Sequence, residues 1–388
     1  MGSVPIGQDA GRWHQMSDYG ALGLRPLINA DARLTRLGGS RMPPEVLEAM
    51  RLAAGSYIDM HALQAAAGER LACLTRNDAA YVTSGAAAGL VVSALACMIG
   101  DELGELANVI EGRSPARNEI VIHRSQRIPY DPAVRLAGGR IVEIGNALQT
   151  FPWELEAALN ERTALVLYVA GEHLRRGALS LESTRAIAHA AGVPVVVDAA
   201  AQLPPVENFW RFTRDLGADL VVFSGGKDLR GPQASGLVLG RADLIASCAL
   251  HGAPHQRLGR PMKVGKEETM GLLAAVERYV GLDHEARARQ FEEVVANWID
   301  RLACVPGVTA TREFPNEAGQ PVPRLRIALD HLTGSPGATG LVGRLLAGDP
   351  AIAVGQDGDA ALLLTPDTLD GDAPEIVIEQ IIAQLRHR

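Results

Sequence analysis

The sequence predicts an α/β fold in which helices cover both faces of a mostly parallel sheet, followed by a smaller α+β part. Short runs rich in Val, Ile and Leu alternate with helical runs through the middle of the chain, and this alternation is typical of parallel sheets. The expected strands lie at 119–123, 140–144, 164–169, 193–198, 219–224 and 235–240, and the expected helices lie near 131–137, 152–160 and 181–191.

The segments on either side of this pattern are organised differently. Residues 26–40 show no regular period, and proline in the first turn predicts a helix from Pro44 to about Ala54. Further expected elements are helices at 61–74, 85–99, 267–303 (with a break near Gly281), 339–347 and 374–387, and strands at 324–328, 352–354 and 361–364. We therefore expect an N-terminal segment (1–50), a large domain (51–270) and a C-terminal part (271–388) made of the long helix and a small α+β domain.

Composition excludes several classes of protein. The 388 residues are 47% hydrophobic and 21% charged, which is ordinary for a globular enzyme. A net charge of −8 argues against nucleic acid as the main partner. The longest apolar run, Ala86–Ile99, is shorter than the roughly 20 residues that span a bilayer, and Met1–Gln15 does not resemble a secretory signal. Four scattered cysteines show no metal-ligand spacing, so we expect a cytoplasmic protein without a metal or a membrane segment.

Asp198 and Lys227 are the residues most informative about function. Asp198 closes one apolar run, and Lys227 follows the next one through the turn Ser224–Gly226. The carboxyl ends of parallel strands meet at one edge of a sheet, where ligands bind. A lysine and a carboxylate there match the two ends of pyridoxal 5'-phosphate (PLP), whose aldehyde forms a Schiff base with lysine and whose ring nitrogen needs an acidic partner. The alternatives are a surface lysine and an aspartate that caps a helix.

A small-residue loop upstream is suited to the cofactor's phosphate. Ser84, Gly85 and Ala86 precede an apolar helix, and the free N–H groups and dipole of a helix start favour an anion. Ser224 offers a second hydroxyl near the lysine. An ordinary helix N-cap is the alternative for this loop.

The chain resembles the fold-type I PLP enzymes, and more narrowly the branch that contains bacterial selenocysteine synthase and D-glucosaminate-6-phosphate ammonia-lyase. The resemblance implies a PLP-transferase fold with a seven-stranded type of sheet. The stretches that carry it are Ile28–Ala30, Leu37–Gly39, Tyr81–Ala87, Arg127–Pro129, Pro194–Ala200, Ser224–Lys227, Gly231–Gln233 and Gly259–Glu267.

The resemblance also implies roles for individual residues. His123, at the end of an expected strand, would stack its ring on the PLP face, or else is a core histidine. Gln202 would donate to the PLP phenolic oxygen, or else holds a loop. Arg127, Arg260 and Arg33 are candidates for a substrate carboxylate or phosphate, because a guanidinium matches planar oxyanions; structural salt bridges are the alternative.

The expected activity is that of a PLP-dependent lyase. With Lys227, Asp198 and His123 as catalytic residues, it would remove the α-proton and a β-substituent from a small anionic amino acid or aminosugar acid, giving a 2-oxo acid and ammonia. Racemisation, aldol cleavage and β-replacement are open alternatives, and selenium transfer on tRNA or a non-catalytic role fits less well. Where the lyase-like members usually carry Thr-Gly-Thr, this chain has Asp31-Ala32-Arg33, which leaves the substrate open. The resemblance implies a homodimer or larger homo-oligomer.

Overall fold

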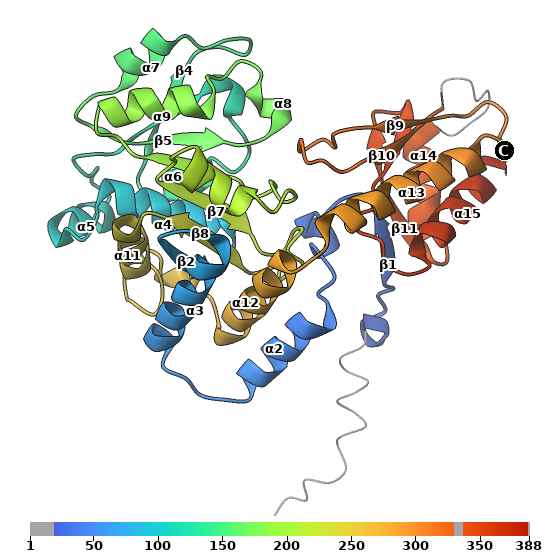
Figure 1. Ribbon diagram of the computed structural model, residues 1–388, viewed down its shortest axis with the longest axis horizontal. Helices are drawn as coiled ribbons and strands as arrows, with labels where there is room; N and C mark the ends of the chain where they lie inside the picture. The colour runs from blue at the N-terminus through green and yellow to red at the C-terminus, as the bar shows by residue number, and fades with distance from the viewer. Residues whose placement is uncertain (1–18, 330–336, 387–388) are drawn as a thin grey trace, which may run out of the picture. The chain divides into compact units, whose positions relative to one another are not determined.

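The computed structural model describes residues 19–329 and 337–386, and the chain forms two compact units (Figure 1). The large unit contains residues 33–287 and 315–322. The small unit contains the N-terminal residues up to Ala32 together with 288–314 and 323–388. These ranges differ from the expected boundaries at residues 50 and 270. The N-terminal strand belongs to the small unit, and residues 271–287 belong to the large unit. No helix in the described part of the chain is both long and apolar enough to cross a bilayer.

The large unit is built on a seven-stranded sheet with the order β2-β8-β7-β6-β5-β3-β4. Strand β8 runs antiparallel to both of its neighbours, and the other paired strands are parallel. This confirms the expected mostly parallel sheet. The strands are β2 (Ala79–Thr83), β3 (Glu119–His123), β4 (Arg140–Ile144), β5 (Thr163–Val169), β6 (Val195–Asp198), β7 (Leu220–Ser224) and β8 (Gly236–Gly240).

Both faces of the inner part of this sheet are buried, which explains why strands such as β5 and β7 are mostly apolar. Successive side chains of a strand point to opposite faces. Thus Val121 of β3 packs in one core cluster, while Ile120 and Ile122 pack in the other. A strand buried on both sides needs a continuous apolar run, and that is the pattern seen in the sequence.

The helices of the large unit follow the expected alternation with strands. They are η2 (Thr35–Leu37), α2 (Pro44–Ala54), α3 (Met60–Thr75), α4 (Ala86–Met98), α5 (Leu103–Ile110), η3 (Arg124–Gln126), α6 (Pro132–Leu136), α7 (Pro152–Ala158), α8 (Glu172–Arg175), α9 (Leu181–Ala190), α10 (Asn208–Trp210), η4 (Arg211–Asp215), α11 (Ala242–His251), η5 (Arg260–Met262) and α12 (Lys266–Val280). Buried residues of α4 such as Leu90 and Leu95 share one core cluster with Val222 of β7, whereas Leu272 of α12 packs in the other.

The small unit has its own five-stranded sheet and core. The sheet order is β1-β11-β12-β10-β9, and the parallel pairing of β1 with β11 joins the start of the chain to its end. Its core includes Trp298, Leu325 and Ile352. The elements are η1 (Tyr19–Leu22), β1 (Leu27–Ala30), β9 (Thr309–Glu313), β10 (Arg324–Ala328), α14 (Gly337–Ala347), β11 (Ala351–Asp357), β12 (Ala361–Leu364) and α15 (Ala373–Arg386).

Some elements differ from the expectation. Strand β1 lies in the segment expected to be irregular, and α5 forms in a stretch for which no element was expected. The break expected near Gly281 in the helix over 267–303 is confirmed, because α12 ends at Gly281 and α13 (His284–Leu302) is a separate helix. A glycine in this position is a common way to stop a helix.

Candidate active site

Asp198 and Lys227 lie together at the carboxyl edge of the large sheet. Asp198 is the last residue of β6, and Lys227 follows the end of the adjacent, parallel strand β7. Burial raises the pKa of Asp198, while the N–H of Ala200 and the positive charge of Lys227 act in the opposite direction. Burial likewise lowers the pKa of Lys227, and the charge of Asp198 opposes that shift. Each group is therefore close enough to feel the charge of the other.

Lys227 differs from the other lysines of this chain. The sequence contains three, and the other two are Lys263 and Lys266. Lys263 is exposed, and the Nζ of Lys266 is 2.5 Å from Glu267 Oε1. Lys227 alone combines a strand end with a buried carboxylate, so it is the amine best placed to bind an aldehyde cofactor.

His123 ends β3 and is fully buried, with its ring edge-to-face against Tyr168 at 5.9 Å between ring centres. Burial lowers its pKa to about 4, and the neighbouring Gln126 opposes this shift. Within the described residues neither ring nitrogen of His123 has a hydrogen-bond partner. The imidazole is therefore neutral at physiological pH, and stacking on a cofactor would require the groups that cover it to move.

Other buried polar atoms lie beside His123 at the same strand end. Gln126 Oε1 accepts a hydrogen bond from the N–H of Val169 at 3.1 Å. Its Nε2, like the hydroxyl of Ser125, has no partner among the described residues. Buried polar groups are normally paired, so several unsatisfied ones at one strand edge fit a site that binds a polar ligand. This donor set, with Asp198 and Lys227, suits PLP.

The phosphate loop lies between β2 and α4. Gly85 has a φ of +144°, and no side chain caps the helix that starts at Ala86. The first N–H groups of α4 are therefore available to an anion. The Ser84 hydroxyl donates to the carbonyl of Met262 at 2.9 Å, which fixes the loop against the segment after α11.

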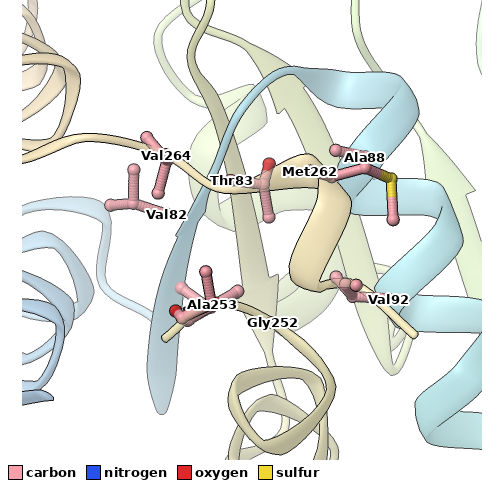
Figure 2. A pocket seen from close by; sticks show the side chains of 10 residues that line it. Val82, Thr83, Ala88, Val92, Gly252, Ala253, Met262 and Val264 are labelled. Atoms are coloured by element: carbon pink, nitrogen blue, oxygen red, sulfur yellow. Dashed lines mark hydrogen bonds between the residues drawn. The ribbon is translucent and has the colours of Figure 1, made fainter. Parts of the chain in front are cut away.

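A small cavity lies behind this loop. Figure 2 shows side chains that line it, among them Thr83 of β2, Val92 of α4 and Met262. The residues that line this cavity are mostly apolar. They pack against the loop, and the cavity is not suited to a charged ligand.

Gln202 and Ser224 stand near the same edge. The amide of Gln202 donates to the carbonyl of Ala318 at 3.0 Å, and its backbone carbonyl accepts from Asn208 at 2.6 Å. Ser224 is the last residue of β7 and is half-buried. The loop role of Gln202 is thus directly visible, while donation to PLP stays a prediction for both residues.

The arginines expected at the substrate do not form one cluster. Arg127 is paired with Asp131 and Glu143. Arg33 is bound to Asp228 at 3.0 Å, with only 8% of its side chain exposed. Both thus have the structural ion pairs that were the alternative to substrate binding.

Arg260, at the start of η5, is different because it is exposed. In residues 19–329 and 337–386 no ion pair is recorded for it. It is the best placed of the three predicted arginines to meet an anionic group from outside.

Sequence reasoning missed Asp228, which directly follows the lysine. Tyr279 and Arg287 bind its carboxylate together with Arg33. Its position directly after the candidate catalytic lysine could have drawn attention to it. Its partners are distant in sequence, so the sequence does not show that they bind it.

Comparison with known proteins establishes the family. A family model described as L-seryl-tRNA selenium transferase matches residues 32–295. The chain belongs to this family. The match covers the strands and loops that carry the candidate site, from the 33–41 segment to the lysine turn and α12.

Proteins named for three different reactions are similar to this chain. A D-glucosaminate-6-phosphate ammonia lyase from Salmonella typhimurium (strain 14028s / SGSC 2262) is 34% identical, with 86% of this chain and 88% of the relative covered. A 5'-C-glycyluridine monooxygenase-decarboxylase from a Streptomyces species is 35% identical over 86% of this chain and 83% of its own length. An L-seryl-tRNA(Sec) selenium transferase from Moorella thermoacetica is 27% identical, with 94% and 82% covered.

A solved structure of D-glucosaminate-6-phosphate ammonia-lyase matches with a TM-score of 0.81 at 31% identity, covering 95% of this chain and 98% of the other. A cysteine desulfurase from Escherichia coli, at 19% identity and a TM-score of 0.56, shares the fold alone. These matches confirm the predicted fold-type I architecture of the chain. They also confirm PLP as its cofactor.

Proposed function

We propose that the protein is a PLP-dependent lyase that removes a β-substituent from a small anionic amino acid or aminosugar acid and releases a 2-oxo acid and ammonia. The observation that carries the proposal is the position of Lys227, at a strand end beside the buried carboxylate of Asp198. The Salmonella relative, a D-glucosaminate-6-phosphate ammonia lyase, supports this reaction class and an aminosugar acid as substrate.

The candidate site residues would have two kinds of role, cofactor binding and proton transfer. Bound PLP supplies an electron sink for negative charge at the substrate α-carbon. Lys227 would hold the cofactor and, once displaced by the substrate amine, take the α-proton at Nζ. Burial favours the neutral amine that this step needs, since it lowers the pKa of Lys227. Asp198 would keep a proton on the ring nitrogen, and His123 would orient the ring.

The phosphate of the cofactor and the anionic group of the substrate need separate binding residues. The N–H groups of Gly85 and Ala86 and the hydroxyl of Ser224 would hold the cofactor phosphate. The Ser84 hydroxyl would join them by turning from the Met262 carbonyl, to which it now donates. Exposed Arg260 would bind the substrate's carboxylate or phosphate. The β-substituent would leave with the electron pair of its bond, and water would hydrolyse the released unsaturated amine to the oxo acid and ammonia.

The Streptomyces relative favours one second candidate. A monooxygenase-decarboxylase at 35% identity is as similar to this chain as the ammonia lyase is. In that case the same lysine and aspartate would serve a reaction that consumes O₂ and loses the substrate carboxylate as CO₂. The two candidates differ in the uptake of O₂ and the release of CO₂, so they can be separated directly.

The test is to incubate PLP-loaded protein with aminosugar acids, with and without a phosphate group, and with β-hydroxy amino acids. Ammonia and 2-oxo acid in equal amounts, without O₂ uptake, would support the lyase. Uptake of O₂ with release of CO₂ would establish the second candidate instead. Inversion at the α-carbon or release of an aldehyde, without ammonia, would contradict both.

The assembly and location of the protein are also proposals. The family resemblance supports a homodimer or larger homo-oligomer, with Arg260 and the segment Met262–Lys266 contributing to a neighbour's site. A fully active monomer in light scattering would contradict this. The acidic chain supports a small-molecule substrate and not tRNA, and a cytoplasmic location stays a prediction.

A further inference from the structure

Asp228 is a buried carboxylate with an unusually complete set of donors. Its side chain is 1% exposed and binds Arg287 at 2.5 and 2.8 Å, Tyr279 Oη at 2.6 Å and Arg33 at 3.0 Å. Burial alone would raise its pKa, but the charges of Arg33 and Arg287 lower the pKa to about 2. Asp228 is therefore ionised throughout the physiological range, immediately after Lys227.

The two arginines come from special positions in the chain. Arg33 is the first residue of the large unit, and Arg287 is the last residue of its main stretch. The chain passes between the two units directly before one and directly after the other. A single carboxylate next to Lys227 thus binds the residues at two of the four points where the backbone enters or leaves the large unit.

The segment 33–41 touches the lysine turn at further places. The Ser40 hydroxyl donates to the carbonyl of Lys227 at 2.6 Å. Arg230 Nε donates to the carbonyl of Arg41 at 2.8 Å. Three contacts therefore fix the backbone around Lys227: Ser40 with the Lys227 carbonyl, the ion pairs of Asp228, and Arg230 with the Arg41 carbonyl.

A buried ion cluster contributes little net stability, because desolvation of the charges offsets their attraction. Its value lies in fixed geometry, which matters most where an amine must meet a reacting carbon, since a misplacement of about 1 Å can cost about 10²-fold in rate. We propose that Asp228 is a positioning residue for Lys227, fixing the lysine turn through Arg33, Arg287 and Tyr279. This inference rests on Lys227 as the PLP-binding lysine of the proposed function.

The chain contains a matched control for Asp228. Asp219, at the opposite end of β7, is also buried and bound by an arginine, Arg241, at 2.6 Å. It lies at the amino edge of the sheet, away from Lys227. Asp219→Asn should therefore cost stability, as Asp228→Asn should, without altering the lysine.

The experiment measures Lys227 itself in PLP-loaded protein. In Asp228→Asn the pH midpoint of the absorbance change of the lysine-linked cofactor should shift by about half a unit or more. The rate of covalent capture of added PLP by the PLP-free protein, and kcat, should both fall about tenfold, with KM changed far less. Asp219→Asn should leave the midpoint and the capture rate unchanged. An equal response of the two variants, or a wild-type midpoint in Asp228→Asn, would overturn the inference.

A second variant protects the test against misfolding. Tyr279→Phe removes one donor from Asp228 and leaves both arginine pairs, so the protein should fold and show a smaller shift of the midpoint in the same direction. If Asp228→Asn does not fold, a Tyr279→Phe protein with wild-type midpoint and capture rate overturns the inference. If wild-type protein forms no borohydride-stable bond between PLP and Lys227, the proposed site itself fails, which is a different result.

Discussion

Both edges of the seven-stranded sheet carry buried polar residues. Those at the amino edge have hydrogen-bond and ion-pair partners, whereas several at the carboxyl edge have few. At the amino edge, Asp219 accepts hydrogen bonds from the N–H of Val195 at 2.7 Å and from Arg241 at 2.6 Å. Glu119, the first residue of β3, is bound by Arg140 at 2.6 Å. Every one of these carboxylates is held by a cation and a further donor.

At the carboxyl edge the buried groups have few partners within the described chain. Asp198 accepts from the N–H of Ala200 at 3.0 Å, and no cation is bonded to it. The imidazole of His123 and the amide nitrogen of Gln126 have no hydrogen-bond partner among the described residues.

The difference distinguishes buried groups whose partners lie within the protein from buried groups that we propose bind the cofactor. A buried group that is fully paired contributes to shape, while a buried group left short of partners costs free energy unless a ligand completes it. The same comparison makes Asp228 informative, because it has the full pairing of the amino edge but stands at the carboxyl edge, next to Lys227.

The largest effect is expected for Lys227→Ala. Without this amine the cofactor has no covalent link at the sheet edge and the substrate has no proton acceptor there, so turnover should fall by about 10⁴-fold. Borohydride reduction followed by peptide mass spectrometry locates the linked lysine. Lys263→Ala, which changes an exposed lysine, should still link PLP to Lys227; PLP fixed mainly to Lys263 or Lys266 would contradict the assignment.

A smaller effect is expected for Asp198→Asn. The amide cannot hold the ring nitrogen protonated, so kcat should fall on the order of 10²- to 10³-fold while PLP still binds. Asp219→Asn at the other edge should unfold at lower denaturant concentration with nearly normal kcat. If Asp198→Asn kept near-native turnover, the functional role of the carboxyl edge would be in doubt.

His123 should make the stability of the protein depend on pH. The unfolded chain takes up a proton near pH 6.5, while the buried imidazole does so only near pH 4. Stability is therefore complete above pH 6.5 and is lost as pH falls towards 4. Between pH 7 and pH 5 this contribution amounts to about 2 kcal/mol. Denaturant unfolding of wild type and His123→Gln at both pH values measures it, and equal pH dependence in the two proteins would refute the burial argument.

The smallest effect is expected at the amino edge for Arg140→Ala. Asn160 and Arg140 lower the pKa of Glu119, but the Arg140 side chain is 59% exposed. Solvent screens such a pair, so the loss should be about 0.5 kcal/mol at pH 7 and should shrink in high salt. A loss that is large and independent of salt would show that the paired edge depends on this one cation.

The sheet and its strand ends were predictable because continuous apolar runs have few other folded solutions. The expected strand 119–123 coincides with β3, and the run that ends at Asp198 became β6. Strand β1 was not expected, because its four residues acquire their structure by pairing with β11 more than 300 residues later. No local pattern records that partner.

The candidate site was partly predictable for the same reason. Asp198 and Lys227 follow apolar runs, so their common edge could be inferred, and the PLP cofactor is confirmed. The pairing of Arg33 with Asp228 and of Ser40 with the Lys227 carbonyl joins residues almost 200 positions apart. Such contacts depend on tertiary packing, so residue types and spacing alone do not indicate them.

The scarcity of lysine has a consequence for how the cofactor finds its place. Only three of the 37 basic residues are lysines, and guanidinium groups stay protonated in proteins. An aldehyde that reaches this surface therefore meets almost no competing side-chain amines, and one of the two competitors is engaged by Glu267. Loading should approach one cofactor per chain even with PLP in excess, without the stray surface adducts that lysine-rich proteins form.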